Sequence, residues 1–214
     1  MAEEIIIAQK ESKTIVKTVS SVEIPKEVIF TIEEEAKAEV RMIFDQPEDK
    51  CLKLKFLLKG KESELQFRGL IIANNNNMPN IDIEVFHLAK NTTANVVWRG
   101  IVTDEARENW RGMISITPQS PGTNSWLEIK TLLLSSGARA TAVPAMEIKA
   151  NKVKASHAAV ISKIDQEQLF YMLTRGLDKT QAEKLLVKGF IEPVMPVATD
   201  VSKLVEPVLT KLFT

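Results

Sequence analysis

The sequence predicts a mainly β protein that ends in a small helical segment. Short apolar or alternating runs, typical of strands, continue from the start of the chain to about Lys163. No long helical pattern separates these runs, which argues against an alternating β/α fold. After Lys163 the hydrophobic period becomes that of helices. We therefore expect a β body over residues 1–163 and a helical subdomain over residues 164–214.

Strands are expected where apolar residues recur with a period of two, or fill a short run between polar turns such as Asn74–Asn77. The predicted strands are Thr14–Val19, Val28–Ile32, Val40–Phe44, Leu52–Leu58, Leu65–Ala73, Ile81–Leu88, Asn95–Val102, Met113–Ile116, Trp126–Leu134, Ala145–Ala150 and Val153–Val160.

Two β architectures fit this pattern, a β-sandwich and a β-solenoid that coils strand upon strand. An aromatic-Arg-Gly triplet favours the solenoid, because recurring corners place a glycine where a Cβ would clash. The triplets are Phe67-Arg68-Gly69, Trp98-Arg99-Gly100 and Trp110-Arg111-Gly112. Their spacing is irregular, so these residues alone leave both architectures open.

The first helix is expected to begin after Asp165, an N-cap residue followed three positions later by Gln168 as in a capping box. Its apolar stripe is Leu169, Met172 and Leu173, and Gly176 is the expected stop.

A second helix is expected between Asp178 and Gly189, with Ala182, Leu185 and Leu186 as its buried face. A third is expected from about residue 200 to residue 213, kinked or split at Pro207.

Composition excludes several classes of partner. The 28 basic residues balance 28 acidic ones, so no net charge favours nucleic acid or anionic lipid. No apolar run approaches the ~20 residues that span a bilayer, and the first residues are acidic where a secretory signal would be basic. Cys51 is the single cysteine, which excludes an intrachain disulfide and a thiolate metal cage. We expect a cytoplasmic protein.

From His87 onward the chain resembles the SufB/SufD family of iron–sulfur cluster assembly scaffolds. The run His87-Leu88-Ala89-Lys90-Asn91-Thr92 is similar to the family's H-L-x-K-N-T turn, and residues 144–148 and 154–159 are similar to family segments. Residues 165–190 match I-D-x-x-Q-L-F-Y-x-x-x-R-G and its continuation to a phenylalanine. The resemblance implies a right-handed parallel β-helix with a C-terminal helical subdomain. We expect this chain to be a short form that lacks the extra N-terminal domain of full-length members.

The same resemblance implies a scaffold that is not an enzyme. Its C-terminal helices would dock a SufC-like ABC ATPase, and its β-helix would pair with a SufB/SufD-like chain or with a second copy. It would hold no tightly bound cofactor, only a transient iron–sulfur cluster shared with the partner chain.

His157 is the candidate cluster-assembly residue and metal ligand, because it aligns with a histidine implicated in SufD. A neutral imidazole is also a competent iron ligand. The alternative is a purely structural role, in which His157 is held by hydrogen bonds on the strand face that it shares with Ala155 and Ala159. Ala138 stands near the position of SufB's cysteine and supplies no thiolate. Ala158 replaces the glutamate of the SufB branch, so the chain is more similar to SufD.

The first helix has more apolar residues than one face can bury, which a docking helix requires. We expect Leu169, Phe170, Tyr171, Arg175 and Phe190 to contact the ATPase partner. The alternative role is to cover the end of the β body.

Two other functions remain possible from the residues. A carbohydrate-active β-helix enzyme would use paired carboxylates such as Asp82 and Glu84, and a stand-alone iron protein would use His157. Cys51 is expected to be a small buried apolar residue, although Lys50 and Lys53 could lower its pKa. His87 is expected to hold its turn by hydrogen bonds.

Overall fold

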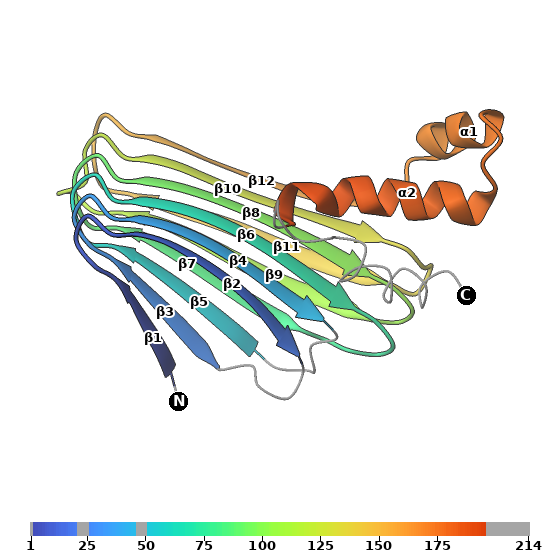
Figure 1. The fold of residues 1–214 in the computed structure, drawn as a ribbon, viewed down its shortest axis with the longest axis horizontal. Coiled ribbons are helices and arrows are strands. Elements are labelled where there is room, and N and C mark those ends of the chain that lie inside the picture. Colours follow the sequence, from blue (N-terminus) through green and yellow to red (C-terminus); the bar gives the residue numbers. More distant parts are fainter. Residues whose placement is uncertain (1, 21–25, 46–50, 196–214) are drawn as a thin grey trace.

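The computed structural model, which describes residues 2–20, 26–45 and 51–195, is a β-solenoid of two facing parallel sheets (Figure 1). Sheet A consists of β1 (Ala2–Ile7), β3 (Glu27–Ile32), β5 (Cys51–Leu58), β7 (Asn80–His87), β9 (Arg107–Ile116) and β11 (Arg139–Ile148). Sheet B consists of β2 (Ser12–Ser20), β4 (Lys37–Asp45), β6 (Glu64–Ala73), β8 (Thr93–Val102), β10 (Asn124–Leu133) and β12 (Lys154–Lys163). The chain alternates between the sheets, which confirms the solenoid over the sandwich.

Most strands lie where the apolar pattern predicts them. β5 and β7 alternate between buried and more exposed positions, as strands with one face in a core should. The pattern missed β1, and β11 begins at Arg139, before the predicted start, and runs through Pro144. Proline is tolerated there because β11 is an edge strand with only β9 as its neighbour.

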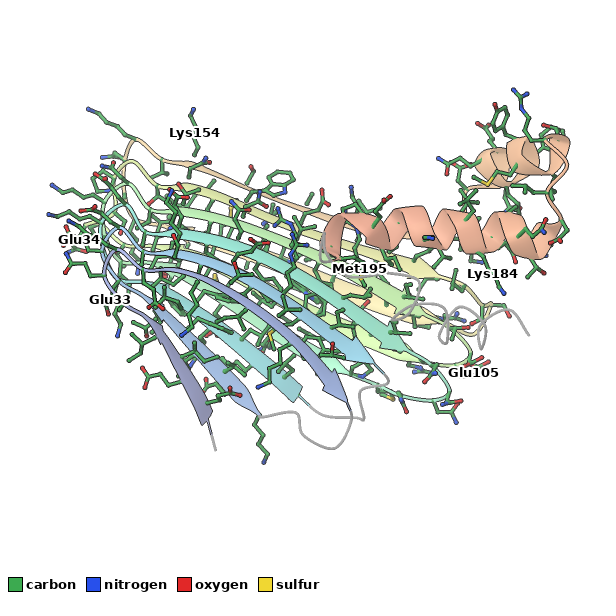
Figure 2. The ribbon with its side chains drawn as sticks, viewed as in Figure 1. Glu33, Glu34, Glu105, Lys154, Lys184 and Met195 are labelled. Carbon is green, nitrogen blue, oxygen red and sulfur yellow. The ribbon has the colours of Figure 1, made fainter. Side chains whose placement is uncertain are left out.

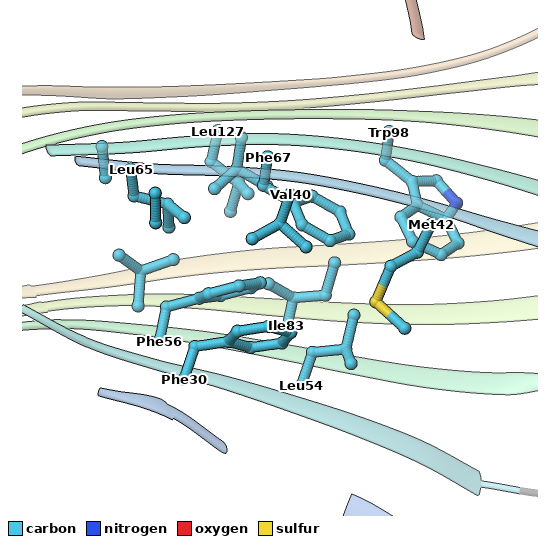
Figure 3. Close-up of a cluster of buried hydrophobic side chains, with 14 of the residues drawn as sticks. Phe30, Val40, Met42, Leu54, Phe56, Leu65, Phe67, Ile83, Trp98 and Leu127 are labelled. Carbon is cyan, nitrogen blue, oxygen red and sulfur yellow. The ribbon is translucent and has the colours of Figure 1, made fainter. Parts of the chain in front are cut away.

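The core lies between the sheets and is built from ladders of inward-facing side chains (Figure 3). The Phe30 and Phe56 rings stack with centroids 5.0 Å apart, and Phe67 stacks on Trp98 at 6.1 Å. Each ring belongs to a neighbouring coil of the same sheet. Apolar side chains at equivalent positions, such as Phe30 and Phe56, or two residues apart in register, such as Phe67 and Trp98, therefore hold successive coils together.

The aromatic-Arg-Gly triplets do not mark corners, and that prediction is wrong. They lie inside strands, where the glycine faces the core and leaves room for a large neighbour. A methyl group on Gly69 would overlap the Trp98 ring, and one on Gly100 would overlap the Glu108 carboxyl group. The corners that lead from sheet A to sheet B instead use residues with positive φ, mostly not glycine: Lys10, Glu35, Glu62, Asn91, Gly122 and Lys152.

The coils lengthen along the chain. In sheet B, Lys13 pairs with Ala38, 25 residues later, while Ala94 pairs with Ser125, 31 residues later. The added residues lie in the sheet A strand, which has 6 residues in β3 and 10 in β9, and in the corner that follows it, so strand pairing is preserved while the sequence period drifts. The aromatic-Arg-Gly triplets are spaced irregularly because they are not equivalent in the fold: Gly69 pairs with Trp98, and the third triplet lies in β9 of the other sheet.

The helical segment consists of α1 (Gln166–Thr174), α2 (Lys179–Ile191) and the 3-10 turn η1 (Glu192–Val194). Asp165 caps α1 as predicted, by accepting hydrogen bonds from the backbone N–H groups of Glu167 and Gln168. The reciprocal capping box is found at α2 instead, between Asp178 and Gln181.

α2 continues past Gly189, where the sequence predicted its end. Val187 and Ile191 are fully buried against apolar residues on the outer face of sheet B, so packing outweighs the low helix propensity of glycine. Leu185, predicted to be buried, is exposed. The predicted third helix lies outside the described residues.

Figure 2 shows Met195 at the end of α2 that meets the sheet, and Lys184 on the part that extends beyond the strands. Among the described residues, neither helix has the length and apolarity needed to cross a membrane.

Candidate functional site

His157 ends an apolar ladder on the inner face of sheet B. The equivalent positions in the preceding coils are Ile15, Val40, Phe67, Val96 and Leu127. The His157 side chain is exposed, and no described residue forms a hydrogen bond with its ring. The imidazole therefore stands at the open end of the core, where another molecule can reach it.

The facing ladder of sheet A ends at Met146. The Phe56 and Phe67 rings meet across the core with centroids 5.1 Å apart, which shows that their two ladders face each other. In sheet A, Met146 occupies the position of the last strand that is equivalent to Phe56. In sheet B, His157 occupies the position of the last strand that is equivalent to Phe67. The last coil therefore presents a thioether and an imidazole from opposite sheets.

The rest of this inner surface is apolar and uncovered. β11 and β12 each pair with a strand on one side only, so their outer edges carry unpaired backbone groups. The inward positions near His157 are occupied by Ala140, Ala142, Pro144, Met146, Ile148, Ala155, Ala159 and Ile161. The first described coil differs, because Glu3 and Lys17 face inward there and form an ion pair at 2.8 Å. Of the two ends, the last coil therefore has the more apolar inner surface.

Ala138, near the position of the SufB cysteine, lies far from His157. It is buried in the corner before β11 with Ala73, Val102 and Ala106. The corner follows Leu133, which pairs with Lys163, six residues beyond His157. At about 3.3 Å per residue, the separation is roughly 20 Å. One chain does not bring these two positions together.

His87 holds its turn by hydrogen bonds, as predicted. Its Nδ1 lies 2.8 Å from Thr92 Oγ1, its Nε2 lies 3.0 Å from Ser125 Oγ, and its backbone oxygen accepts from Ser120 Oγ at 2.7 Å. The ring is fully buried, and this burial lowers its pKa to about 4. His87 is therefore a neutral structural residue at physiological pH.

His87 should make the protein sensitive to acid. Between pH 6.5 and about 4 the unfolded chain binds this proton and the folded chain does not, so stability falls as the pH falls. The full loss should approach about 3 kcal/mol. Urea unfolding at pH 7, 5.5 and 4 measures it, and the His87→Gln variant should show a shallower slope. Equal slopes would contradict the assignment.

The carboxylates of the predicted enzyme site are occupied in ion pairs across sheet A. Asp82 accepts from Arg111 Nε at 2.8 Å and from its Nη2 at 3.1 Å, and Glu84 pairs with Lys53 at 2.9 Å. These contacts join neighbouring strands and favour no hydrolytic role.

Cys51 is exposed, so its predicted burial is wrong: it is the first residue of β5 and lies on the outer face.

The first helix exposes two aromatic side chains. Phe170 and Tyr171 are 68% and 56% exposed, and Leu173 is also exposed. The Arg175 guanidinium lies over the Tyr171 ring at 4.9 Å and donates to its hydroxyl oxygen at 2.8 Å. This contact holds the tyrosine in place without covering it. α1 therefore presents a preformed aromatic and cationic surface.

The other predicted contact residues lie within the molecule. Leu169 is buried, and Phe190 packs against the outer face of sheet B. The Arg99 guanidinium lies 5.5 Å from the Phe190 ring centroid and donates to the Phe190 carbonyl oxygen at 3.3 Å. Arg41 likewise donates to the Met195 carbonyl oxygen at 2.5 Å. The sequence did not reveal this role, because only the fold brings these strands to the end of α2.

Glu108 is a buried acid that sequence reasoning also missed. Its carboxyl group accepts from Trp98 Nε1 at 3.2 Å and from Thr131 Oγ1 at 2.7 Å, within the core. Burial raises its pKa.

Among the described residues, no group of three or more His, Cys, Asp or Glu side chains is arranged to hold a metal ion.

Comparison with known proteins gives this geometry a context. Residues 11–190 match the family model described as "SUF system FeS cluster assembly, SufBD core domain". The chain is 27% identical over 154 residues to an iron–sulfur cluster assembly SufBD family protein of Mycobacterium tuberculosis, covering 70% of this chain and 18% of that protein. It is 28% identical over 137 residues to the iron–sulfur cluster assembly protein SufB of Bacillus subtilis, covering 64% and 30%. The matches thus span less than a third of these relatives.

Proposed function

Because this chain belongs to the SufB/SufD family of iron–sulfur cluster assembly proteins, we propose that it is a non-enzymatic, SufD-like scaffold of a SUF-type complex in the cytoplasm. The observation that carries the proposal is the open last coil, where His157 stands among exposed apolar residues. Ala138 and Ala158 at the SufB-specific positions support the SufD-like role.

The last coil pairs with a SufB/SufD-like chain or with a second copy. Another β-helix can extend this surface, because both of its strands are edge strands. Its inner face is apolar, and the inward positions around His157 carry no charge. Pairing would remove Met146, Ile148 and Ile161 from water, all of which are exposed.

In the paired state, His157 contributes an imidazole to a transient cluster whose thiolates come from the partner chain. The chain's single cysteine, Cys51, is on the outer face of sheet A and cannot serve from there. The cluster is cargo of the assembly reaction, and this chain holds no cofactor of its own.

α1 docks a SufC-like ABC ATPase through Phe170 and Tyr171. The strand that carries His157 leads directly through Ile164 and Asp165 into α1. A displacement of α1 by the ATPase would therefore act first on β12, an edge strand held by β10 on one side only. This connection supports a role in which nucleotide-driven motion alters the pairing surface.

Replacing both Phe170 and Tyr171 with alanine should weaken the complex with a co-expressed SufC-like ATPase by at least tenfold. Exposed aromatic residues dominate the energy of such interfaces. Surface plasmon resonance on the purified proteins measures the change. Val16→Ala, at a 54% exposed apolar position on β2, should bind like the wild type. Unchanged affinity in the double variant, or no complex at any salt concentration, would rule out this docking surface.

A further inference from the structure

Arg68 is a half-buried cation without an acidic partner on the outer face of sheet B. Its Nη1 donates to the backbone oxygens of Phe67 and Asn95 at 2.8 and 3.0 Å, and its Nη2 donates to Gln66 Oε1 at 3.2 Å. All of these acceptors are neutral, and no carboxylate of the described residues forms an ion pair with it. The guanidinium is therefore hydrogen-bonded, but its positive charge is not neutralised by a direct ion pair.

The charged residues around Arg68 add to the local excess of positive charge. Arg41 pairs with Glu39 at 2.9 Å, while Arg99 and Lys130 share Glu128 at 2.8 and 3.3 Å. Burial is the main cause of the lowered pKa of Arg68; repulsion by Arg41 and Arg99 adds to it, while attraction by Glu39 and Glu128 opposes it. Within this cluster the cations Arg41, Arg68, Arg99 and Lys130 outnumber the carboxylates Glu39 and Glu128, while Glu64 on the same face pairs with Lys37.

The surroundings of Arg68 have the composition of a protein interface. Gln66, Asn95 and Trp126 occupy one ladder of the outer face, beside Arg68, and Glu39, which is paired with Arg41, precedes them in that ladder. Trp126 is only half-buried, in contrast to the fully buried Trp98 and Trp110. Arginine and tryptophan are the residue types that most often anchor protein partners, and side-chain amides add hydrogen bonds. α2 and η1 pack against the neighbouring apolar ladders of this face.

We propose that the surface formed by Gln66, Arg68, Asn95 and Trp126 binds a carboxylate on an acidic segment of a protein partner. A single carboxylate matches the single unpaired guanidinium and relieves its repulsion by Arg41 and Arg99. A long polyanion such as nucleic acid or an anionic membrane fits poorly, because Glu39, Glu64 and Glu128 lie on the same face. This surface is separate from α1 and does not depend on ATPase docking.

The test titrates the full chain with a glutamate-rich hexapeptide and with its glutamine counterpart of equal length. Binding is followed by the Arg68 Nε–H resonance and by Trp126 fluorescence. We expect a saturable shift with the acidic peptide at an affinity at least tenfold above that of the glutamine peptide, weakened by salt. Arg68→Gln should reduce the affinity at least tenfold. Arg111→Gln, which removes an arginine from the opposite sheet, should leave it unchanged.

Several results would overturn the proposal. They are the absence of a saturable shift, equal binding by Arg68→Gln, or inorganic phosphate binding as tightly as the peptide, which would indicate a simple anion site. The unfolding temperature of Arg68→Gln should equal or exceed that of the wild type, because an unpaired cation is removed. A clear decrease would instead assign Arg68 a structural role. Asp200 lies in residues 196–214, outside the described residues. A tenfold gain in peptide affinity on Asp200→Asn would show that this C-terminal segment, and not a partner, occupies the Arg68 surface.

Discussion

A Met146→Glu substitution should abolish pairing through the last coil, weakening the complex by at least about a hundredfold. In the paired state Met146 would be covered by the partner, beside apolar residues and opposite the His157 imidazole, with no Lys or Arg among the inward positions around it. Leaving a carboxylate unpaired in such an interface costs about 3 kcal/mol or more, and each 1.4 kcal/mol is about tenfold in affinity. Sedimentation velocity with the SufB/SufD-like chain, and with this chain alone, measures the loss.

Met113→Glu is the matched control for this substitution. Met113 is 37% exposed and Met146 is 38% exposed, but Met113 lies on the outer face of β9. The same chemical change at similar exposure should therefore leave pairing intact. If both variants pair normally, the last coil is not the interface. If both fail, the effect is one of net charge.

Gly60→Ala should destabilise the fold by about 3 kcal/mol or more. Gly60 lies in the corner after β5, and a methyl group added there would overlap the backbone of Glu33 and Glu34 in the preceding coil. Figure 2 shows these two glutamates at the turns of the solenoid. Backbone atoms cannot rotate away as a flexible side chain can, so the coils must separate locally. Overpacking of this kind costs ~1–3 kcal/mol, and more where the neighbours are rigid.

The same substitution at Gly189 should have the opposite sign. Gly189 lies inside α2 with nothing within reach of an added methyl group. Alanine there should stabilise the protein by roughly 0.5–1 kcal/mol, because it restricts the unfolded chain and favours the helix. Urea unfolding of both variants gives the comparison. A stable Gly60→Ala protein would show that the corners tolerate wider coil spacing.

Much of the fold could be predicted from residue patterns. Alternation in segments such as Leu52–Leu58 predicted strands correctly, because one face of each strand meets the core. The caps Asp165 and Asp178 predicted where both helices begin, since capping depends on residues a few positions apart. The family motif also directed attention to His157.

Other features depend on contacts between distant residues. Gly69 appeared to be a corner glycine, but the Trp98 ring, one coil away, explains its small size. Cys51 was expected to be buried because it begins an apolar run, but its place in the register puts it on the outer face. No local pattern could show that Arg68 lacks an acidic partner, because its neighbours Arg41 and Arg99 come from other coils.

The chain by itself determined a β-rich body, a helical tail with defined starts, a histidine in the last strand and membership of the SufB/SufD family. These follow from short-range periodicity, capping and motif, which are written in consecutive residues. Only the tertiary structure decided that His157 and Met146 end facing ladders at an open coil, and that Phe190 packs inward while Phe170 and Tyr171 remain exposed. The reason is that coil lengths vary, so the register between coils is set by packing across the core.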